Sequence, residues 1–333
     1  MKTVLVAGAA GYIGSHMIKA LLAAGHNAIA LDNLSTGHRH AVLGGAFVQG
    51  DLGDALLLDR LFADNKIDGV IHFASYIQVG ESVQKPDKYY ANNVSNTLRL
   101  LKAMVESGVK HFVFSSSAAV YGEPQRTPID ESHPKNPLTP YGRSKWMVEQ
   151  ILEDFDRAYG LKSTSLRYFN AAGADPAGQL GEQHDPETHL IPLALRVASG
   201  RQDAIRLFGR DYGTPDGTCI RDYVHVADLC DAHLLALDSL WGGSASTAYN
   251  LGSGSGFSVQ RVISVAEQVT GRRINAIASA RRPGDPAILV ADAQRARADL
   301  GWKPRLSELE TIISHAWQWE QKVCGSRSGK LKS

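Results

Sequence analysis

Short runs rich in Val, Ile, Leu and Phe alternate with longer amphipathic stretches along the first half of the chain. This pattern is typical of parallel strands that helices cover on both faces. The runs predict six strands, at 3–7, 28–32, 46–49, 69–73, 111–115 and 163–167. The stretches between them predict helices at 12–24, 55–63, 87–107 and 142–159. Such an alternation predicts a doubly wound α/β fold that binds ligands at the carboxyl ends of its strands.

The composition and the hydrophobic pattern of the sequence change after Asn170. Segment 173–187 is rich in Gly, Asp, Pro and Gln, and no comparable series of strands is predicted after it. Later elements are predicted as a helix at 226–240, a strand at 248–251, a turn at 252–256, and helices at 259–270 and 307–321. We therefore expect a first domain over 1–170, which 220–252 rejoin, and a smaller mixed α/β lobe from 171–219 and 253–322. The small and basic residues of 323–333 predict a disordered tail.

Composition and charge narrow the class of protein. The chain has 333 residues, 44% of them hydrophobic, which is enough to bury a full core. The formal net charge of +1 favours neither a nucleic acid nor a membrane surface as partner, so any anionic ligand must be held locally. No apolar stretch approaches the roughly 20 residues of a membrane span, and no signal-peptide pattern opens the chain. We expect a soluble cytoplasmic protein.

Cysteine and histidine usage argues against a metal centre. Cys219, Cys230 and Cys324 form neither a C-x-x-C pair nor a disulfide framework, which suits a reducing compartment. The twelve histidines contain no H-E-x-x-H motif and no clustered set, and His72 and His225 are interpreted as buried structural residues. The sequence therefore predicts no metal ligands.

A glycine-rich turn, Gly8-Ala-Ala-Gly11-Tyr-Ile-Gly14, follows the first predicted strand and opens a helix. Gly8 permits the tight turn, Gly11 lets the backbone approach a pyrophosphate, and Gly14 lets helix and strand pack closely. Asp32 ends the second strand, where a carboxylate accepts hydrogen bonds from an adenosine ribose and repels a 2′-phosphate. The glycines alone would also suit a surface turn, but Asp32 favours an NAD-binding Rossmann domain. Their three-and-three spacing resembles the extended branch of the short-chain dehydrogenase/reductase superfamily.

Tyr141 and Lys145 are the candidate reacting pair. Four residues apart, they lie on one face of a predicted helix. An adjacent ammonium and a cationic nicotinamide both favour the tyrosine's phenolate, which can take a proton from a sugar hydroxyl. Ser117, at the end of the fifth predicted strand, is a candidate proton relay, although Ser115 and Ser116 remain alternatives. Without the glycine turn, Tyr141 and Lys145 would be read as ordinary surface residues.

Several long segments resemble the UDP-glucose 4-epimerase family, also called UDP-galactose 4-epimerase. The resemblance runs from the first strand to about Lys322. The segments that carry it are Gly11-Tyr-Ile-Gly-Ser-His16, Leu31-Asp-Asn-Leu34, Val79-Gly-Glu-Ser-Val-Gln-Lys-Pro86, Ser115-Ser-Ser-Ala-Ala-Val-Tyr-Gly122, Tyr141-Gly-Arg-Ser-Lys145, Leu166-Arg-Tyr-Phe-Asn170, Asp216-Gly-Thr-Cys-Ile-Arg-Asp-Tyr-Val-His225 and Arg281-Arg-Pro-Gly-Asp285. The resemblance implies bound NAD, a UDP-hexose substrate and a homodimer formed through the helices at 87–107 and 142–159.

The resemblance also implies residue roles. Ser117, Tyr141 and Lys145 would be catalytic. The cofactor contacts, besides the three glycines, Tyr141 and Lys145, would be Tyr12, Ile13, Asp32, Asn33, Asp51, Leu52, Phe73, Ala74, Asn92 and Phe169. The sugar nucleotide would be held by Ser117, Asn170, His189, Leu190, Phe208, Arg221, Arg282, Asp285 and Leu289. Arg221 and Arg282 offer forked donors to a diphosphate, although each alone would be read as a surface ion-pair partner.

The chain departs from the family pattern at several positions. Ala7 and Ala9 replace a common threonine and glycine but leave the three essential glycines in place. Ile77 stands where many relatives carry a lysine that reaches the cofactor phosphates, which predicts looser NAD retention. His189 and Leu289 stand where a well-studied branch has asparagine and tyrosine. The smaller wall at Leu289 predicts that N-acetylated sugars also fit.

The implied reaction is redox-neutral. Tyr141, assisted by Ser117, removes the proton of the hexose 4-hydroxyl as hydride passes from carbon 4 to NAD, and the keto sugar turns before hydride returns. A 4,6-dehydratase would need an acid and base pair where Ala118 and Ala119 stand. Closer alternatives are 4-epimerases of UDP-N-acetylglucosamine, UDP-glucuronate or UDP-xylose, which differ only in pocket contacts. A cofactor-sensing protein without catalysis is disfavoured because both Tyr141 and Lys145 are present.

Overall fold

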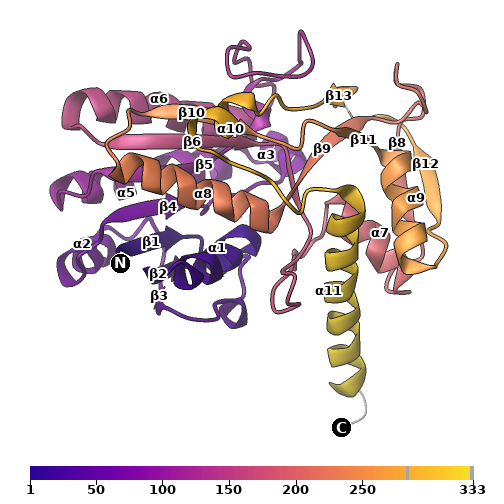
Figure 1. Cartoon of the computed structure of the whole chain (residues 1–333), viewed down its shortest axis with the longest axis horizontal. Helices are drawn as coiled ribbons and strands as arrows, with labels where there is room; N and C mark the ends of the chain where they lie inside the picture. Colours follow the sequence, from indigo (N-terminus) through magenta and orange to yellow (C-terminus); the bar gives the residue numbers. More distant parts are fainter. Residues whose placement is uncertain (283–284, 331–333) are drawn as a thin grey trace.

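The computed structural model describes residues 1–282 and 285–330. Its centre is a sheet of seven parallel strands in the order β10-β6-β5-β4-β1-β2-β3 (Figure 1). Their bounds are β1 Thr3–Ala7, β2 Asn27–Asp32, β3 Ala46–Gln49, β4 Gly69–His72, β5 His111–Ser117, β6 Lys162–Tyr168 and β10 Thr247–Leu251. The predicted doubly wound fold is confirmed, and the strand predicted at 248–251 does join the sheet, beside β6.

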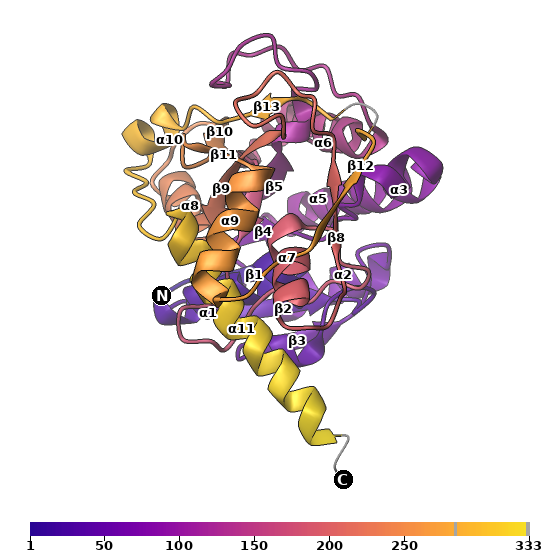
Figure 2. The ribbon, with the colours of Figure 1, turned by 90° about the vertical axis from the view of Figure 1, so that its right-hand side faces the viewer.

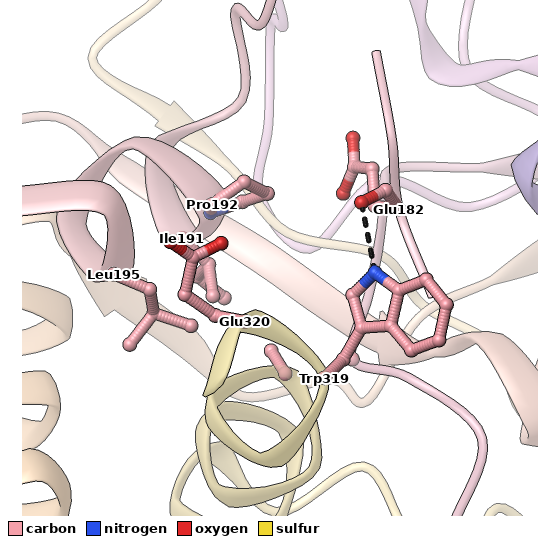
Figure 3. A pocket seen from close by; sticks show the side chains of 8 residues that line it. Glu182, Ile191, Pro192, Leu195, Trp319 and Glu320 are labelled. Carbon is pink, nitrogen blue, oxygen red and sulfur yellow. Dashed lines mark hydrogen bonds between the residues drawn. The ribbon is translucent and has the colours of Figure 1, made fainter. Parts of the chain in front are cut away.

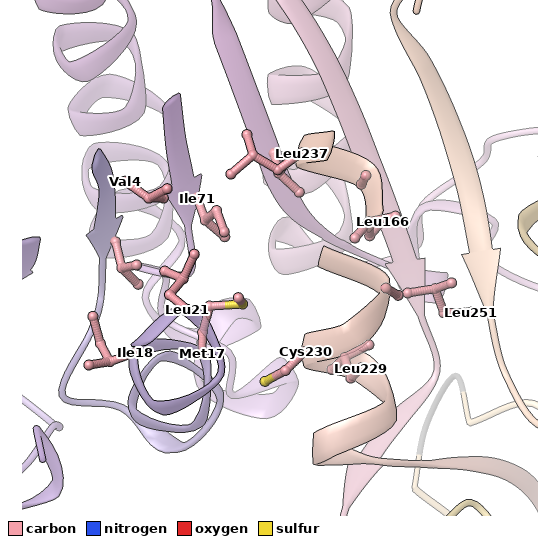
Figure 4. Close-up of a cluster of buried hydrophobic side chains, with 14 of the residues drawn as sticks. Val4, Met17, Ile18, Leu21, Ile71, Leu166, Leu229, Cys230, Leu237 and Leu251 are labelled. Carbon is pink, nitrogen blue, oxygen red and sulfur yellow. The ribbon is translucent and has the colours of Figure 1, made fainter. Parts of the chain in front are cut away.

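The strands are apolar at successive positions because both faces of the sheet are covered. In β1, Val4 and Val6 enter one core, whereas Leu5 and Ala7 enter the other. The first core is shared with α1 (Tyr12–Ala23) and α8 (Val226–Trp241) (Figure 4). The second core is shared with α2 (Ala55–Asp64), α5 (Asn96–Glu106) and α6 (Pro140–Tyr159).

The single helix predicted at 87–107 is divided in the structure. α4 (Pro86–Tyr90) covers its start, and a π turn over Ala91–Ser95 leads into α5; a further short helix, α3 (Val79–Gln84), precedes the predicted range. Proline at the first position suits a helix start, since its missing N–H would have no partner there. Single π turns inside helices are frequent at functional sites, and this one carries the candidate cofactor residue Asn92.

The catalytic helix begins earlier than predicted. Thr139 caps α6 by accepting a hydrogen bond from the Gly142 N–H at 3.3 Å, and Pro140 occupies the first turn. The helix ends at Gly160, whose φ of +66° lies in the left-handed region. Tyr141 therefore belongs to the first turn of α6, close to the sheet edge.

The second half of the chain contains more strands than predicted. β7 (Asn170–Ala172), β9 (Ile220–His225), β11 (Gly256–Ser258) and β13 (Ile288–Leu289) form one small sheet, and β8 (Ile205–Phe208) pairs with β12 (Ala276–Ser279). These strands have two to six residues, too few for a clear alternation. Three helices pack together beside them: α7 (Leu190–Ala198), which was not predicted, α9 (Val259–Thr270) and α11 (Leu309–Lys330) (Figure 2). A short helix, α10 (Gln294–Asp299), packs near β10.

The C-terminal prediction needs correction. α11 continues through Lys330, so the tail predicted as disordered at 323–333 is helical as far as that residue. A packed helix extends at little cost, because each added residue gains one hydrogen bond once the first turns exist. Residues 331–333 lie outside the described part of the chain. Within 1–282 and 285–330, no helix has both the length and the apolar character needed to cross a membrane.

Candidate dinucleotide and sugar-nucleotide site

The strand order reverses between β1 and β4. From β1 the chain proceeds to β2 and β3 on one side of the sheet, and from β4 it proceeds through β5 and β6 on the other. The chain therefore leaves β1 and β4 in opposite directions, and the loops that follow these two strands flank the crevice where doubly wound sheets bind ligands. The two loops meet closely here: the N–H groups of Phe73 and Ala74 donate to the Ala7 carbonyl at 2.8 and 3.1 Å.

The glycine turn is built for close backbone approach. Gly8 has a φ of +81°, and a Cβ there would lie 2.5 Å from the Ala74 nitrogen. A Cβ on Gly14 would lie 2.0 Å from the Gly8 carbonyl oxygen, so only glycine lets α1 start this near β1. The N-cap residue Gly11 offers no side chain, and the first turn of α1 carries no acidic residue. The N–H groups of this turn therefore fit the pyrophosphate of a dinucleotide.

A hollow lies against the glycine turn. It is lined by Ala10, Gly11, Tyr12, Ser15, Thr36, His38, Ala41, Gly181, Gln183 and His184. The Tyr12 side chain points away from solvent and donates a hydrogen bond to the Gly173 carbonyl at 2.7 Å. Ile13 packs against the α1 and α8 core. Tyr12 and Ile13 thus contribute backbone to the turn while their side chains fix it to the rest of the molecule.

The predicted adenosine residues lie together beyond β2 and β3. The buried Asp32 carboxylate accepts hydrogen bonds from the N–H groups of Ala10 and Leu34, both at 2.8 Å, and so ties the glycine turn to the loop after β2. Asn33 Nδ2 donates to Asp51 Oδ2 at 2.6 Å. Leu52 is buried in the core beneath. Carboxylate and amide oxygens thus gather where a ribose and an adenine would be recognised.

Tyr141, Ser117 and Lys145 converge at the end of β5. Ser117 is the last residue of β5, and its side chain lies near enough to the Tyr141 phenol to lower the pKa of that group. Lys145 follows one turn later in α6, with its Nζ 5.9 Å from the centre of the Tyr141 ring. The buried Lys145 ammonium donates to Ser75 Oγ at 2.9 Å and to the Ser115 carbonyl at 2.8 Å. Two fixed acceptors therefore hold it.

The three consecutive serines have different partners. The Ser115 hydroxyl pairs with the Tyr168 hydroxyl, and Ser116 Oγ donates to Glu149 Oε1 at 2.5 Å. Glu149 is in turn ion-paired with Arg167 in the interior. Of the three serines, Ser117 is the one whose side chain lowers the pKa of Tyr141, which favours it over Ser115 and Ser116 as the candidate proton relay.

Burial dominates the electrostatics of the reacting pair. It raises the pKa of Tyr141 above 10, and the hydrogen bond from Ser117 opposes that rise. Burial also lowers the pKa of Lys145 to about 7, with the Glu149 charge opposing. Lys145 alone therefore does not produce the expected phenolate. The remaining expected source of positive charge is a bound nicotinamide.

Two positioning residues were missed by sequence reasoning. Ser75 lies in the loop after β4, and its role as an acceptor for Lys145 became visible only with the order of the strands in the sheet. Asn93 lies in the π turn, and its side-chain amide accepts from the Tyr76 N–H at 2.9 Å and donates to the Tyr76 carbonyl at 3.0 Å. It also donates to Ser144 Oγ in α6 at 3.2 Å, while Asn92 donates to Asn93 Oδ1 at 2.9 Å. The loop after β4 is thus tied to the catalytic helix.

The remaining cleft residues line the walls. Phe73 packs against His233, with 4.8 Å between ring centres, and Ala74 packs against the α2, α5 and α6 core. Phe169 and Leu289 both pack against a small buried cluster made of Ala118, Val120, Tyr121 and Ile129. Ala118 directly follows the candidate proton relay Ser117.

The candidate sugar-nucleotide residues come from the second half of the chain. Arg221, in β9, is ion-paired with Asp285. Arg282 stacks over the Phe208 ring at 4.1 Å. Asn170 opens β7, and Leu190 opens α7. Two forked cations and a carboxylate thus lie near one another, although Pro283 and Gly284 between them are outside the described residues.

His189 is placed differently from the other candidates. Its Nδ1 pairs with Glu182, and His184 and Glu187 complete a compact group around it. The sequence predicted no clustered histidines, whereas the structure brings two histidines and two glutamates together. The cluster was missed because no spacing motif marks it.

Fold and site together define a dinucleotide-binding protein of the Rossmann type, in which Ser117, Tyr141 and Lys145 are the candidate reacting residues. Residues 4–252 match the NAD dependent epimerase/dehydratase family. The chain is 52% identical over 319 residues to a UDP-glucose 4-epimerase of Streptococcus mutans, covering 95% of this chain and 96% of the relative. The chain belongs to the NAD-dependent epimerase/dehydratase family.

Solved structures agree with this assignment. A UDP-glucose 4-epimerase from Brucella ovis in complex with NAD superimposes with a TM-score of 0.93 at 48% identity, covering 95% of this chain and 98% of that one. A UDP-glucose 4-epimerase from Bifidobacterium longum in complex with NAD⁺ and UDP gives 0.92 at 41% identity, covering 96% and 98%.

Proposed function

We propose that the protein is a UDP-glucose 4-epimerase, an isomerase that interconverts UDP-glucose and UDP-galactose by transient oxidation at carbon 4. The observation that carries the proposal is the placing of Lys145 one helical turn after Tyr141, with its Nζ 5.9 Å from the centre of the Tyr141 ring and held by Ser75 and by the Ser115 carbonyl in β5. The similarity to UDP-glucose 4-epimerases over 95% of the chain supports it.

The residues of the chain take distinct roles in this reaction. When bound, NAD supplies a reversible hydride acceptor for carbon 4. Tyr141 accepts and returns the proton of the 4-hydroxyl. The Ser117 hydroxyl relays this proton between the substrate oxygen and the Tyr141 phenol. Lys145 supplies positive charge near the phenol, and its hydrogen bonds to Ser75 and Ser115 fix its position.

Substrate anchoring belongs to the second lobe together with Arg221 of β9, which comes from segment 220–252 of the first domain. We assign NAD binding to 1–170 with 220–252, and UDP-sugar binding to 171–219 and 253–322. Arg221 and Arg282 hold the diphosphate, and Asp285 accepts from the uridine ribose. A firm hold on UDP with a loose hold on the hexose would let the 4-keto sugar turn while it stays tethered, so that hydride could return from the bound cofactor to the other face of carbon 4.

We further propose a cytoplasmic homodimer that serves galactose metabolism or nucleotide-sugar supply. Two large apolar side chains support an interface along α5 and α6, since Leu98 is 43% exposed and Met147 is 41% exposed. Sedimentation at micromolar concentration should give twice the chain mass, and Leu98→Lys with Met147→Lys should return it to the mass of one chain.

One assay tests the main proposal. The purified protein is supplied with UDP-galactose, UDP-N-acetylgalactosamine or UDP-glucuronate, and the 4-epimers are separated by chromatography. We expect conversion of UDP-galactose to UDP-glucose without net consumption of NAD. Turnover of UDP-glucuronate alone would favour the alternative, a 4-epimerase of another UDP-sugar, and formation of a 4-keto-6-deoxy sugar would contradict both.

A further inference from the structure

A compact group of nitrogen and oxygen donors lies in the segment before α7. Glu182, His184, Glu187 and His189 each direct one donor atom into it, and these four atoms lie within 4.8 Å of one another. The reaction proposed above uses none of the four. The set of two imidazoles and two carboxylates is one that Zn²⁺ accepts in proteins.

The spacing of the donor atoms is close to that of a metal site. His184 Nδ1 lies 2.8 Å from Glu182 Oε1, and His189 Nδ1 pairs with the same oxygen. Glu187 Oε1 lies 3.9 and 4.0 Å from these two nitrogens. Ligands at about 2.0–2.1 Å from a tetrahedral zinc are separated by about 3.3 Å, so shifts of about 1 Å bring all four to the ion.

Glu187 is a buried carboxylate with one oxygen that lacks a hydrogen bond. Its side chain has no exposed surface, and its Oε2 accepts no hydrogen bond; the nearest cation there, Arg196, is 3.7 Å away. Its Oε1 is fixed by the N–H groups of Thr188 and His189 at 2.8 and 3.0 Å. Glu182 is also almost fully buried. Two carboxylates of this group are thus buried, and a divalent cation between them would cancel their two negative charges.

The cluster is fastened to elements on two sides. The edge of the Tyr12 ring contacts His184, with 6.3 Å between ring centres, so the cluster adjoins the glycine turn. On the other side, Trp319 Nε1 in α11 donates to the Glu182 carbonyl at 3.2 Å (Figure 3). Figure 3 shows the Glu182 carboxylate turned away from the Trp319 ring. Gly181 leaves room for that ring, because a Cβ there would lie 2.2 Å from Trp319 Cγ.

We propose that Glu182, His184, Glu187 and His189 bind a divalent transition-metal ion, with Zn²⁺ as the best match. The ion is structural. It neutralises the buried carboxylates and fixes segment 181–189, whose Gly181, Gln183 and His184 line the hollow at the glycine turn. This role for His189 replaces the contact with the sugar nucleotide that its sequence position implied.

Metal binding by the full-length protein tests the proposal. The chain is stripped with a chelator, dialysed against Zn²⁺ and analysed for metal, and Co²⁺ is added separately as a probe of coordination. We expect about one equivalent of Zn²⁺ per chain, visible Co²⁺ absorption of a four-coordinate site, and a rise in Tm of about 4 °C at one hundred times the Kd. Less than a tenth of an equivalent would overturn the proposal.

Variants separate this site from adventitious binding. His184→Asn with His189→Asn should abolish the Co²⁺ spectrum and the rise in Tm, whereas His26→Asn with His111→Asn, two histidines outside the cluster, should keep both. If the first double variant does not fold, Glu187→Gln, which preserves side-chain shape, should weaken Zn²⁺ binding more than about tenfold. Binding that is unchanged in Glu187→Gln or in the cluster double variant would refute the assignment. Neither result depends on epimerase activity.

Discussion

Tyr141 depends on residues from two elements that the chain places far apart in sequence. Ser117 reaches it from the end of β5, and Thr139 sets the first turn of α6 from which its ring projects. The surroundings keep the phenol protonated in the chain alone, because burial raises the pKa of Tyr141. The tyrosine is therefore a base only when positive charge is added beside it.

Removing the Tyr141 hydroxyl should abolish proton transfer and little else. We expect Tyr141→Phe to lower kcat for UDP-galactose by about 10²- to 10⁴-fold, the usual range for a lost general base. NAD content after denaturation should equal that of the unaltered protein. Tyr159→Phe, at the exposed far end of the same helix, is the matched control and should keep full activity. Full activity of Tyr141→Phe would refute its role as the base.

Leu289 should set the tolerance for N-acetylated sugars. It packs with Phe169 beside the catalytic serine, so a larger side chain there narrows the cleft. We expect the unaltered protein to turn over UDP-N-acetylgalactosamine. In Leu289→Tyr, kcat/KM for that substrate should fall by about 10- to 200-fold, while kcat/KM for UDP-galactose changes little. The prediction fails if the unaltered protein epimerises UDP-galactose but not the N-acetylated sugar.

At the scale of elements, the loop after β4 is the part of the cofactor cleft that departs from the family pattern. Asn93 in the π turn holds its backbone at Tyr76, and the next residue, Ile77, is 41% exposed. An apolar side chain offers no charge to a phosphate, whereas lysine would.

NAD should consequently be held less firmly than a lysine at this position would allow. We expect the purified protein to contain less than one NAD per chain after gel filtration, and Ile77→Lys to raise that content. The measurement is NAD released by denaturation and quantified by an enzymatic cycling assay. Val79→Lys, two residues further along and also exposed, controls for added charge. Stoichiometric NAD in the unaltered protein would contradict the prediction.

The sequence predicts those site residues that lie at the end of a predicted strand or at a fixed spacing on a predicted helix. Asp32 and Ser117 end buried strands, and Gly8 follows one. Apolar runs predict these strands, and ligands of doubly wound sheets bind at the carboxyl ends of the strands, so the sequence alone places the three residues at one site. Lys145 was placed by its spacing from Tyr141. Its acceptors Ser75 and Ser115 could be found only once the sheet order was known.

Other features could not be predicted because they depend on tertiary packing. The π turn arises inside a stretch whose periodicity is continuously helical, and Asn93 gains its partners from that turn. The cluster of Glu182, His184, Glu187 and His189 lies in a polar segment without periodicity. Its shape is fixed by Tyr12 and Trp319, which come from opposite ends of the chain.

At the scale of the whole molecule, buried neutral histidines should make the protein sensitive to acid. Burial lowers the pKa of His16 and His233 from 6.5 to about 4, and that of His72 and His225 to about 3. The unfolded chain takes up these protons near pH 6.5, but the folded chain does not. Their contribution is therefore complete above pH 6.5 and is lost as the pH falls toward 4.

The expected slope is large enough to measure. Each such histidine removes about 1.4 kcal/mol of unfolding free energy per pH unit within that window. Urea unfolding should show a midpoint that falls steeply between pH 6 and 5. His72→Gln should reduce the slope by about a quarter of the histidine contribution. Equal midpoints at pH 7 and pH 5 would show that these side chains are not neutral in the folded protein.

The position of β10 at the edge of the large sheet leaves β6 without its outer neighbour while the protein is being synthesised on the ribosome. β6 ends at Tyr168, but its outer neighbour β10 begins only at Thr247. While the intervening chain emerges from the ribosome, the backbone N–H and C=O groups on that side of β6 lack their final partner. An open edge of this kind is a template for strands of other chains. A polypeptide that stops at Trp241 keeps the edge bare, and we expect it to aggregate where the complete chain stays in solution.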